Sequence, residues 1–345
     1  MSETDTAEYN SNPKAFALYR LPETTTFNLI TNFPASGKDA AKFLFHPFDT
    51  DKTASIVIRG SHEILNIEEL LKQKKSLSNL KLEPSSNMDR LKENEYKSLV
   101  NKALHSIQSN ELRKVVLSRS ECRPRNPEHE PIDFFINLCD KYPQTFNLLF
   151  HHPEAGTWLM ASPEILVSRN ERYFKTMALA ATWPANDGAP KWSFKEFEEQ
   201  GMVLQFILLQ LKGLVREMKV SERYTRNAGP VNHLCNDLSF KSELSPEEIA
   251  ALLHPTPAIA GLPREESLQF IRKFENYDRS YYTGFSGPVL AKEAHLFVNL
   301  RCLQVFEDSW VAYSGGGLVE GSDAENEWKE TEYKLRTLWS VLEKM

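Results

Sequence analysis

Two helical patterns in the sequence carry carboxylates on the side where apolar residues are expected. The first, 193–219, begins with a Ser-x-x-Glu capping box. At about 100° per residue, Glu199 falls in the same arc as Val203 and Phe206. A charge within a buried face is costly unless it is paired or binds a metal. The alternative is that Glu199 lies near the helix start and only favours the helix dipole.

The second pattern, 322–344, has a similar feature. Glu327, Glu330 and Lys334 lie along one flank of an apolar stripe, at spacings of three, four and seven residues. Two carboxylates and a lysine therefore line one edge of the buried face. The same spacing also describes an ordinary surface Glu–Lys pair, which is worth about a few tenths of a kcal/mol.

A glycine run directly before this second helix offers a place for an anion. The run is SGGGLVEG (314–321), and its backbone N–H groups would lie bare beside a helix start. Together with Arg301 on the preceding strand pattern, it suggests a small carboxylate ligand held by arginine, lysine and backbone amides. Oxygen ligands from Glu199 and Glu330, with waters, would suit Mg²⁺.

These residues need a scaffold, and the hydrophobic periodicity predicts strands and helices in separate blocks. Period-two patterns favour antiparallel hairpins, and helical spacing favours long helices. The strand patterns cover 27–31, 54–60, 113–120, 145–152, 156–162, 164–170 and 172–180, then 280–291, 295–306 and 310–321, and the helical patterns cover 94–112, 193–219 and 322–344. The stretch 67–94 is dominated by Lys, Leu, Ser, Asn and Glu, and its core SLSNLKLEPSSN (76–87) is typical of a loop or exposed linker. The prediction is an α+β fold with large antiparallel sheets.

Composition excludes several classes of protein. The chain has 41 Lys and Arg against 47 Asp and Glu, a net charge of −6, and 41% hydrophobic residues. These values allow a sizeable core and give no polybasic excess for nucleic acid or a membrane surface. The apolar runs are too short to cross a bilayer, the N-terminus lacks a signal-peptide pattern, and the four cysteines form no CxxC pair. We therefore expect a cytoplasmic protein whose chemistry comes from oxygen and nitrogen groups.

From residue 112 to the C-terminus the sequence resembles the chorismate-utilising enzymes, and the isochorismate synthases among them. The shared motifs follow one another in order: KVVLSRS (114–120), MASPEIL (160–166), SFKEFEEQ (193–200), LLHPTPAIAGLP (252–263), ENYDRSYYTGFSG (275–287), FVNLRC (297–302), SGGGLV (314–319) and ENEWKETEYKL (325–335). Several motifs in the right order are much more specific than any one of them. The N-terminal third matches only loosely.

The resemblance implies a fold of two large antiparallel β-sheets packed together, with helices on the outside and the site between the sheets. Its expected organisation is a single structural domain. Within it, residues 1–12 would form a disordered N-terminus, 13–93 a variable N-terminal part of the sheet scaffold, and 94–345 the chorismate-binding catalytic region.

The resemblance also implies a reaction, the conversion of chorismate to isochorismate, in which water adds at C2 while the C4 hydroxyl leaves. By analogy with the family's motifs, Lys114 would activate the water and Glu164 would be the general acid. The lysine must then be partly neutral near pH 7, and the glutamate must keep its proton. On residue type alone, Lys114 could be an edge-strand charge and Glu164 a strand-end carboxylate.

The remaining roles that the resemblance implies concern metal and substrate. Mg²⁺ would be held by Glu199 and Glu330, with Glu327 supporting that shell. Substrate binding is implied for a set of residues from several motifs: Thr182, His254, Arg301, Gly315, Gly316, Gly317 and Lys334. On residue type alone, His254 could equally be a loop histidine with its hydrogen bonds satisfied by the protein.

Two positions depart from the family pattern. Ala181 stands in the turn LAATW (179–183), where relatives usually have glycine, and Gln200 replaces a histidine that follows the helix glutamate. If the turn requires a positive φ, alanine costs about 1 kcal/mol there, or it narrows the pocket. Both changes affect the expected substrate detail and leave the principal catalytic groups in place.

The sequence therefore predicts a Mg²⁺-dependent isochorismate synthase for menaquinone or siderophore biosynthesis. The nearest alternative is a salicylate synthase, which goes on to eliminate pyruvate; anthranilate and aminodeoxychorismate synthases, which use ammonia, fit less well. A non-catalytic anion-binding or metal-binding protein is a further alternative, although it would not need both Lys114 and Glu164. We expect chorismate as the bound small molecule, no nucleic-acid or membrane partner, and a monomer.

Overall fold

The computed structural model describes residues 14–33, 41–85, 91–185 and 187–345. The predicted disordered N-terminus, residues 1–12, lies outside them. Within the described ranges, no helix has the length and hydropathy of a membrane span.

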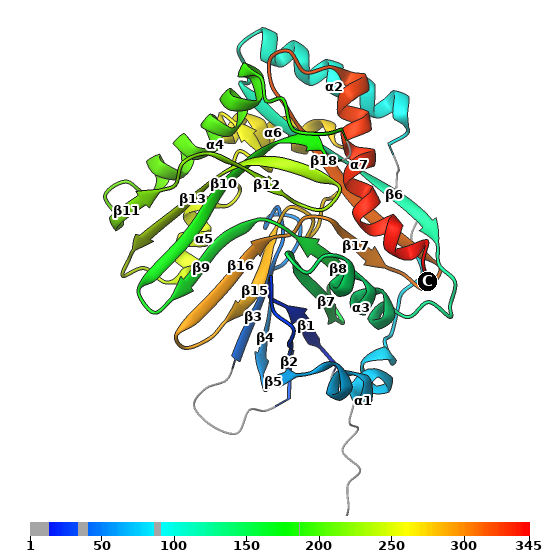
Figure 1. Cartoon of the computed structure of the whole chain (residues 1–345). Coiled ribbons are helices and arrows are strands. Elements are labelled where there is room, and N and C mark those ends of the chain that lie inside the picture. The colour runs from blue at the N-terminus through cyan, green and yellow to red at the C-terminus, as the bar shows by residue number, and fades with distance from the viewer. Residues whose placement is uncertain (1–13, 34–40, 86–90, 186) are drawn as a thin grey trace, which may run out of the picture.

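Two antiparallel sheets form the scaffold, as predicted (Figure 1). The first has the order β14 (Gly261–Leu262), β6 (Lys114–Pro124), β18 (Ser309–Leu318), β17 (Cys302–Val305), β8 (Gly156–Ser162), β7 (Phe146–His152), β1 (Phe16–Arg20), β2 (Phe27–Thr31) and β5 (His62–Leu65). The second has the order β11 (Arg216–Val220), β13 (Val231–Lys241), β10 (Tyr173–Pro184), β9 (Ile165–Asn170), β16 (Glu293–Val298), β15 (Phe285–Val289), β3 (Ala41–His46) and β4 (Ile56–Gly60), with β12 (Tyr224–Asn227) beside β13.

Aromatic side chains join the two sheets. Phe150 of β7 stacks on Phe45 of β3 with ring centroids 4.1 Å apart, and Phe146 of β7 stacks on Phe297 of β16 at 4.3 Å. The alternate residue Leu149 faces the other way, toward a helix-covered core, while Leu148 lies on the aromatic side. Because both faces of β7 are covered, nearly every residue in the strand is buried, and the alternation of a half-exposed strand is lost.

Seven helices in the described residues lie outside the sheets (Figure 1). Helices α1 (Ile67–Ser78), α3 (Pro131–Lys141) and α7 (Ala324–Leu342) pack on the first sheet, α2 (Glu93–Gln108) and α6 (Arg264–Phe274) pack around β6, and α4 (Phe194–Leu211) and α5 (Pro246–Leu253) pack on the second. The predicted layer order, two packed sheets with helices outside, is confirmed.

Two boundaries of secondary structure were predicted wrongly. The loop expected at 76–87 begins only after Ser78, because α1 covers residues 67–78: Asn66 and Glu69 make its capping box, and Leu70 and Leu77 pack into the core. The first long helix was expected to run to residue 219, but α4 ends at Leu211. Gly213 adopts a φ of 77° just beyond the helix, and the chain then turns into β11, which pairs with β13.

A buried ion pair fastens β6 to the segment that follows α6. Glu275 and Arg279 meet at 2.6 Å, and both side chains are 1% exposed. The Glu275 carboxylate accepts from the backbone N–H of Ser118 at 2.7 Å, and Arg279 donates to the carbonyls of Val116 and Ile259 at 2.7 and 2.9 Å. The pair therefore holds two cavity walls, Val116 and Ile259, at a set distance.

We predict that Glu275→Gln lowers the free energy of unfolding by about 3–5 kcal/mol, because it leaves the Arg279 charge buried without a counter-ion. Equilibrium unfolding in urea measures the change. The matched control is Glu217→Gln, which breaks an exposed pair with Lys241 and should change stability by at most about 1 kcal/mol. A Glu275→Gln protein as stable as the control would show that β6 does not depend on this pair.

Candidate active site

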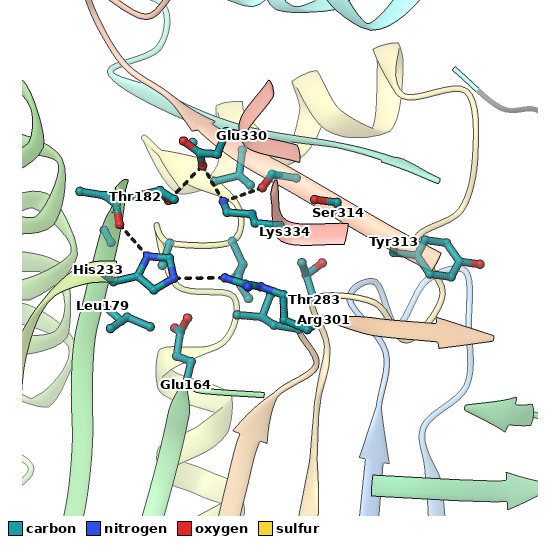
Figure 2. Close-up of a pocket in the computed structure, with 18 of the residues that line it drawn as sticks. Glu164, Leu179, Thr182, His233, Thr283, Arg301, Tyr313, Ser314, Glu330 and Lys334 are labelled. Carbon is teal, nitrogen blue, oxygen red and sulfur yellow. Dashed lines mark hydrogen bonds and ion pairs between the residues drawn. The ribbon is translucent and has the colours of Figure 1, made fainter. Parts of the chain in front are cut away.

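One cavity collects most of the residues that the sequence singled out (Figure 2). It lies where the ends of β10 and β13 approach β18 and α7. The predicted residues that line it are Glu164, Thr182, Glu199, Arg301, Gly315, Gly317, Glu330 and Lys334. Lys114, Gly316 and Glu327 lie directly behind this wall, within contact distance of its members.

Lys114 is buried at the start of β6 and forms an ion pair with Glu199. Its side chain is 1% exposed, and its Nζ lies 3.0 Å from Glu199 Oε1. On β6, Lys114 shares the inner face with Val116, which lines the cavity, while Val115 packs outward against the helices. Glu199 thus lies on the buried side of α4, where the sequence placed it.

Glu164 points into the cavity from the segment before β9 (Figure 2). Burial raises the pKa of this carboxyl to about 8, although the charges of Lys114, Lys334 and Arg301 pull it down in part. A carboxyl with this pKa holds its proton near pH 7 and can give it to a bound molecule.

Arg301 is a buried cation whose partners are neutral. It lies after β16 with a φ of 47°, and donates to Thr337 Oγ1 and His233 Nε2, each at 3.2 Å. In the described part of the chain, no carboxylate lies within ion-pair distance of Arg301, and burial lowers its pKa to about 10. Its charge is therefore available to an anion in the cavity.

His233 lines the cavity and was missed by the sequence analysis. It lies on β13, where its Nδ1 is 2.6 Å from the carbonyl oxygen of Ala181. Burial, and then the charges of Arg301 and Lys334, lower its pKa to about 3, so the ring is neutral. The only available signal was its place in a strand pattern, on the same face as Val231 and Cys235, both of which are buried.

A group of carboxylates lies on the other side of the cavity, along α7. Glu330 accepts from Lys334 at 2.6 Å and from Thr182 Oγ1 at 3.1 Å (Figure 2). Burial tends to raise the pKa of Glu330, but the charge of Lys334 and these hydrogen bonds outweigh it, and the pKa is lowered. Burial, and then Glu330, raise the pKa of Glu327 to about 8.

The sequence predicts that Glu199 and Glu330 hold Mg²⁺ with support from Glu327. Among the described residues, no three His, Cys, Asp or Glu side chains already stand in a metal-binding arrangement. The donor set nevertheless fits Mg²⁺, because Oε2 of Glu327 is buried without a hydrogen-bond partner and its carboxylate is destabilised by Glu330. The positive charge nearest to Glu327 is Lys195, whose Nζ is 3.7 Å from Oε1.

The three glycines of β18 let these groups approach the strand. A Cβ on Gly316 would lie 2.9 Å from Glu327 Oε2, and one on Gly317 would lie 2.8 Å from Glu199 Oε1. β17 pairs with β18 only as far as Ala312, so the following residues have one strand edge open, where Lys334 donates to the carbonyl of Gly315 at 2.8 Å. The backbone of this run is therefore accessible from the cavity.

His254 does not line the cavity, contrary to prediction. It follows α5 and lies one layer behind the wall, where Nε2 is 3.0 Å from the carbonyl oxygen of Thr283. Its ring packs edge-on against the stacked rings of His46 and Phe285, and burial lowers its pKa to about 3. Thr283, whose carbonyl oxygen is this partner, does line the cavity.

The two departures from the family pattern are both buried. Ala181 has a φ of 61°, inside an irregularity where the register of β10 against β13 shifts, so the turn does require the left-handed conformation that glycine adopts freely. Gln200 lies behind the cavity and donates to the carbonyl of Ala178 and to Asn236 Oδ1. Its amide thus bonds within the protein core.

Residues 41–343 match the family model described as chorismate binding enzyme. The isochorismate synthase MenF of Pasteurella multocida is 28% identical over 313 residues, which are 86% of this chain and 70% of that protein. The isochorismate synthase DhbC of Bacillus subtilis is 32% identical over 71% of this chain and 66% of its own length. The chloroplastic isochorismate synthase 2 of Arabidopsis thaliana is 30% identical over 73% of this chain and 47% of its own length.

Two solved structures share the fold. The menaquinone-specific isochorismate synthase of Escherichia coli superposes with a TM-score of 0.75 at 20% identity, covering 96% of this chain and 90% of that one. Anthranilate synthase component I of Streptococcus pneumoniae gives 0.71 at 16% identity, covering 98% and 95%. At these identities the structural similarity supports a shared fold and nothing further. From the family model, which spans nearly the whole described chain, we conclude that this protein belongs to the chorismate binding enzyme family.

Proposed function

We propose that this protein is an isochorismate synthase, which isomerises chorismate by adding water at C2 and releasing the C4 hydroxyl. The observation that carries the proposal is the pairing of an acid with a basic group around one cavity. Glu164 lines the cavity and keeps a proton near neutral pH, and Lys114 lies directly behind the wall, 3.0 Å from Glu199, which lines the cavity. The names of the curated relatives support the same reaction.

In this proposal the cations that line the cavity bind the substrate. Chorismate carries two carboxylates, and Arg301 and Lys334 supply positive charge with donors that suit them. The open edge of β18 at Gly315 and Gly317 adds backbone groups at the same wall. Thr182, fixed on Glu330, borders the ring.

The proposed chemistry moves one proton on each side of the ring. Lys114 Nζ, in its neutral form, takes a proton from water as the water oxygen bonds to C2. The two ring double bonds shift, the C4–O bond breaks, and Glu164 gives its proton to the departing hydroxyl, which leaves as water. One water is consumed and one released, and exchange with solvent returns Lys114 and Glu164 to their starting forms.

Glu199 and Glu330, supported by Glu327, would hold Mg²⁺ in this proposal. When bound, the ion would supply positive charge beside a substrate carboxylate. Two of these side chains also have roles of their own: Glu199 orients the Lys114 amino group, and Glu330 anchors Thr182 and Lys334.

Two classes of pathway could use the product, namely menaquinone biosynthesis and siderophore biosynthesis. The relatives include menaquinone-specific and vibriobactin-specific isochorismate synthases, and we propose that the product feeds menaquinone or siderophore biosynthesis. A cytoplasmic location and a monomeric state stay predictions.

A single assay tests the proposed function against its alternatives. Purified protein is incubated with chorismate and Mg²⁺, with and without ammonium, and the products are resolved chromatographically. Isochorismate as the accumulating product supports the proposal. Salicylate with pyruvate indicates a salicylate synthase, and anthranilate or aminodeoxychorismate indicates an ammonia-using enzyme. No turnover under any condition would refute an enzymatic role with chorismate.

We predict that Lys114→Ala lowers kcat by about 10²–10⁴-fold, the usual contribution of a positioned general base, and still binds chorismate. Steady-state kinetics and calorimetric titration measure the two quantities. Lys102→Ala, which removes a lysine from an exposed helix position, is the matched control and should be fully active. An active Lys114→Ala enzyme would refute the role of Lys114 as base.

We predict that the slope of log kcat/KM against pH decreases by about one as the pH rises through about 8, because only the protonated form of Glu164 can act as acid and its pKa is raised to about 8. The acid form is complete well below that pH and falls about tenfold per unit above it. Glu164→Gln should lose turnover, while Glu198→Gln, on the exposed side of α4, should keep the wild-type profile. A flat profile between pH 7 and pH 9.5 would contradict this role.

We predict that Glu199→Ala and Glu330→Ala each raise the Mg²⁺ concentration for half-saturation by about tenfold or more, since each removes a hard oxygen ligand. Direct Mg²⁺ titration by calorimetry and the Mg²⁺ dependence of the rate measure this. The control is Glu332→Ala, which removes an exposed glutamate of α7, the helix that carries Glu330. Metal titrations that match the wild type would show that these carboxylates do not bind the ion.

A further inference from the structure

The Arg301 guanidinium is held by two neutral acceptors. Thr337 of α7 accepts from Nη1, and His233 of β13 accepts from Nη2, each at 3.2 Å. A carboxylate at either place would hold the guanidinium more strongly, but it would cancel the charge that an anionic ligand needs. Neutral acceptors therefore fix the orientation of Arg301 and leave its charge uncompensated.

The hydrogen bonds of His233 determine its tautomer. Its Nδ1 lies 2.6 Å from the Ala181 carbonyl oxygen, which can only accept, so Nδ1 must carry the proton. Nε2 then presents a lone pair, which matches the Nη2 donor of Arg301 (Figure 2). A histidine protonated on both nitrogens would lose this acceptor and place a second positive charge beside Arg301.

The same imidazole reaches the opposite wall of the cavity through the Ala181 turn. Ala181 is held at a φ of 61°, a conformation that alanine adopts only when its surroundings impose it. The next residue, Thr182, donates to Glu330, which also accepts from Lys334. A continuous set of contacts thus runs from Arg301 through His233 and the Ala181–Thr182 turn to Lys334.

We propose that His233 is a positioning residue, which aims the Arg301 guanidinium at a substrate carboxylate and holds the Ala181–Thr182 turn against Glu330. The inference rests on the proposed function, because it assigns the substrate carboxylate to Arg301. His233 takes no part in proton transfer to the substrate. Its contribution is to binding, so its loss affects KM more than kcat.

Three substitutions separate the two hydrogen bonds of His233. The amide of Gln extends about as far as Nε2, so His233→Gln can keep an acceptor for Arg301. The amide of Asn reaches only about as far as Nδ1, so His233→Asn can keep the donor to Ala181 and loses the acceptor. His233→Leu keeps the bulk and loses both hydrogen bonds.

We expect KM for chorismate to stay within about threefold of wild type in His233→Gln. In His233→Asn and His233→Leu we expect KM to rise about tenfold or more, which corresponds to the free energy of a lost hydrogen bond to a charged group. In all three, kcat should change by a smaller factor than KM.

The matched control is His151→Gln on β7. His151 is also buried and neutral, with its pKa lowered to about 4 by burial, and it bonds to Thr157 away from the cavity. Thermal melting followed by circular dichroism reports the structural cost of each variant. The control should lose stability and keep the wild-type KM.

The outcomes distinguish the two proposals. A wild-type protein that does not convert chorismate overturns the proposed function, and this inference with it. An active wild type with KM unchanged in both His233→Asn and His233→Leu overturns this inference alone. A rise in KM that His233→Gln fails to reverse also overturns it, because the acceptor for Arg301 would then not be what matters.

Discussion

The Glu275 carboxylate and the Arg279 guanidinium meet at 2.6 Å in the interior, and the walls of the cavity depend on that contact. Both groups also bond to backbone atoms: Glu275 accepts from the N–H of Ser118 in β6, and Arg279 donates to the carbonyls of Val116 and Ile259. Two charges buried together are stable only when every donor and acceptor is satisfied. The pair therefore sets the position of β6, and with it that of Lys114, four residues before Ser118.

The charged groups around the cavity have fewer charged or hydrogen-bonding partners than the Glu275–Arg279 pair. Arg301 is bound by neutral groups, and Oε2 of Glu327 has no partner among the described residues. Such groups cost stability when the cavity holds no ligand, because burial penalises an ionised group that lacks a counter-charge. Arg301 and the α7 pair of Glu330 and Lys334 line the same cavity. This arrangement is suited to an anionic substrate and a cation bound together, which is the basis of the function proposed above.

Close approach of backbone and side chain is the second constraint on the site. The Cβ-free positions Gly316 and Gly317 admit the carboxylates of Glu327 and Glu199, and larger residues there would push both away. Ala181 meets a similar demand less easily, since its φ of 61° disfavours any residue with a Cβ. Its carbonyl is nevertheless the acceptor that sets the tautomer of His233. The strained Ala181 turn therefore also fixes the His233 ring, which in turn contacts Arg301.

The sequence by itself determined the elements and several members of the site. Periodicity of 3.6 places Glu199 on the inner face of α4 and puts Glu330 and Lys334 on one flank of α7, because neighbours along a helix are set by spacing alone. Only the tertiary structure decided which buried polar groups meet. His233 reaches Arg301 through a strand register that shifts at Ala181, and His254 lies one layer behind the cavity because its ring packs with Phe285. In a sheet covered on both faces, local spacing does not tell which face meets the cavity; long-range packing does.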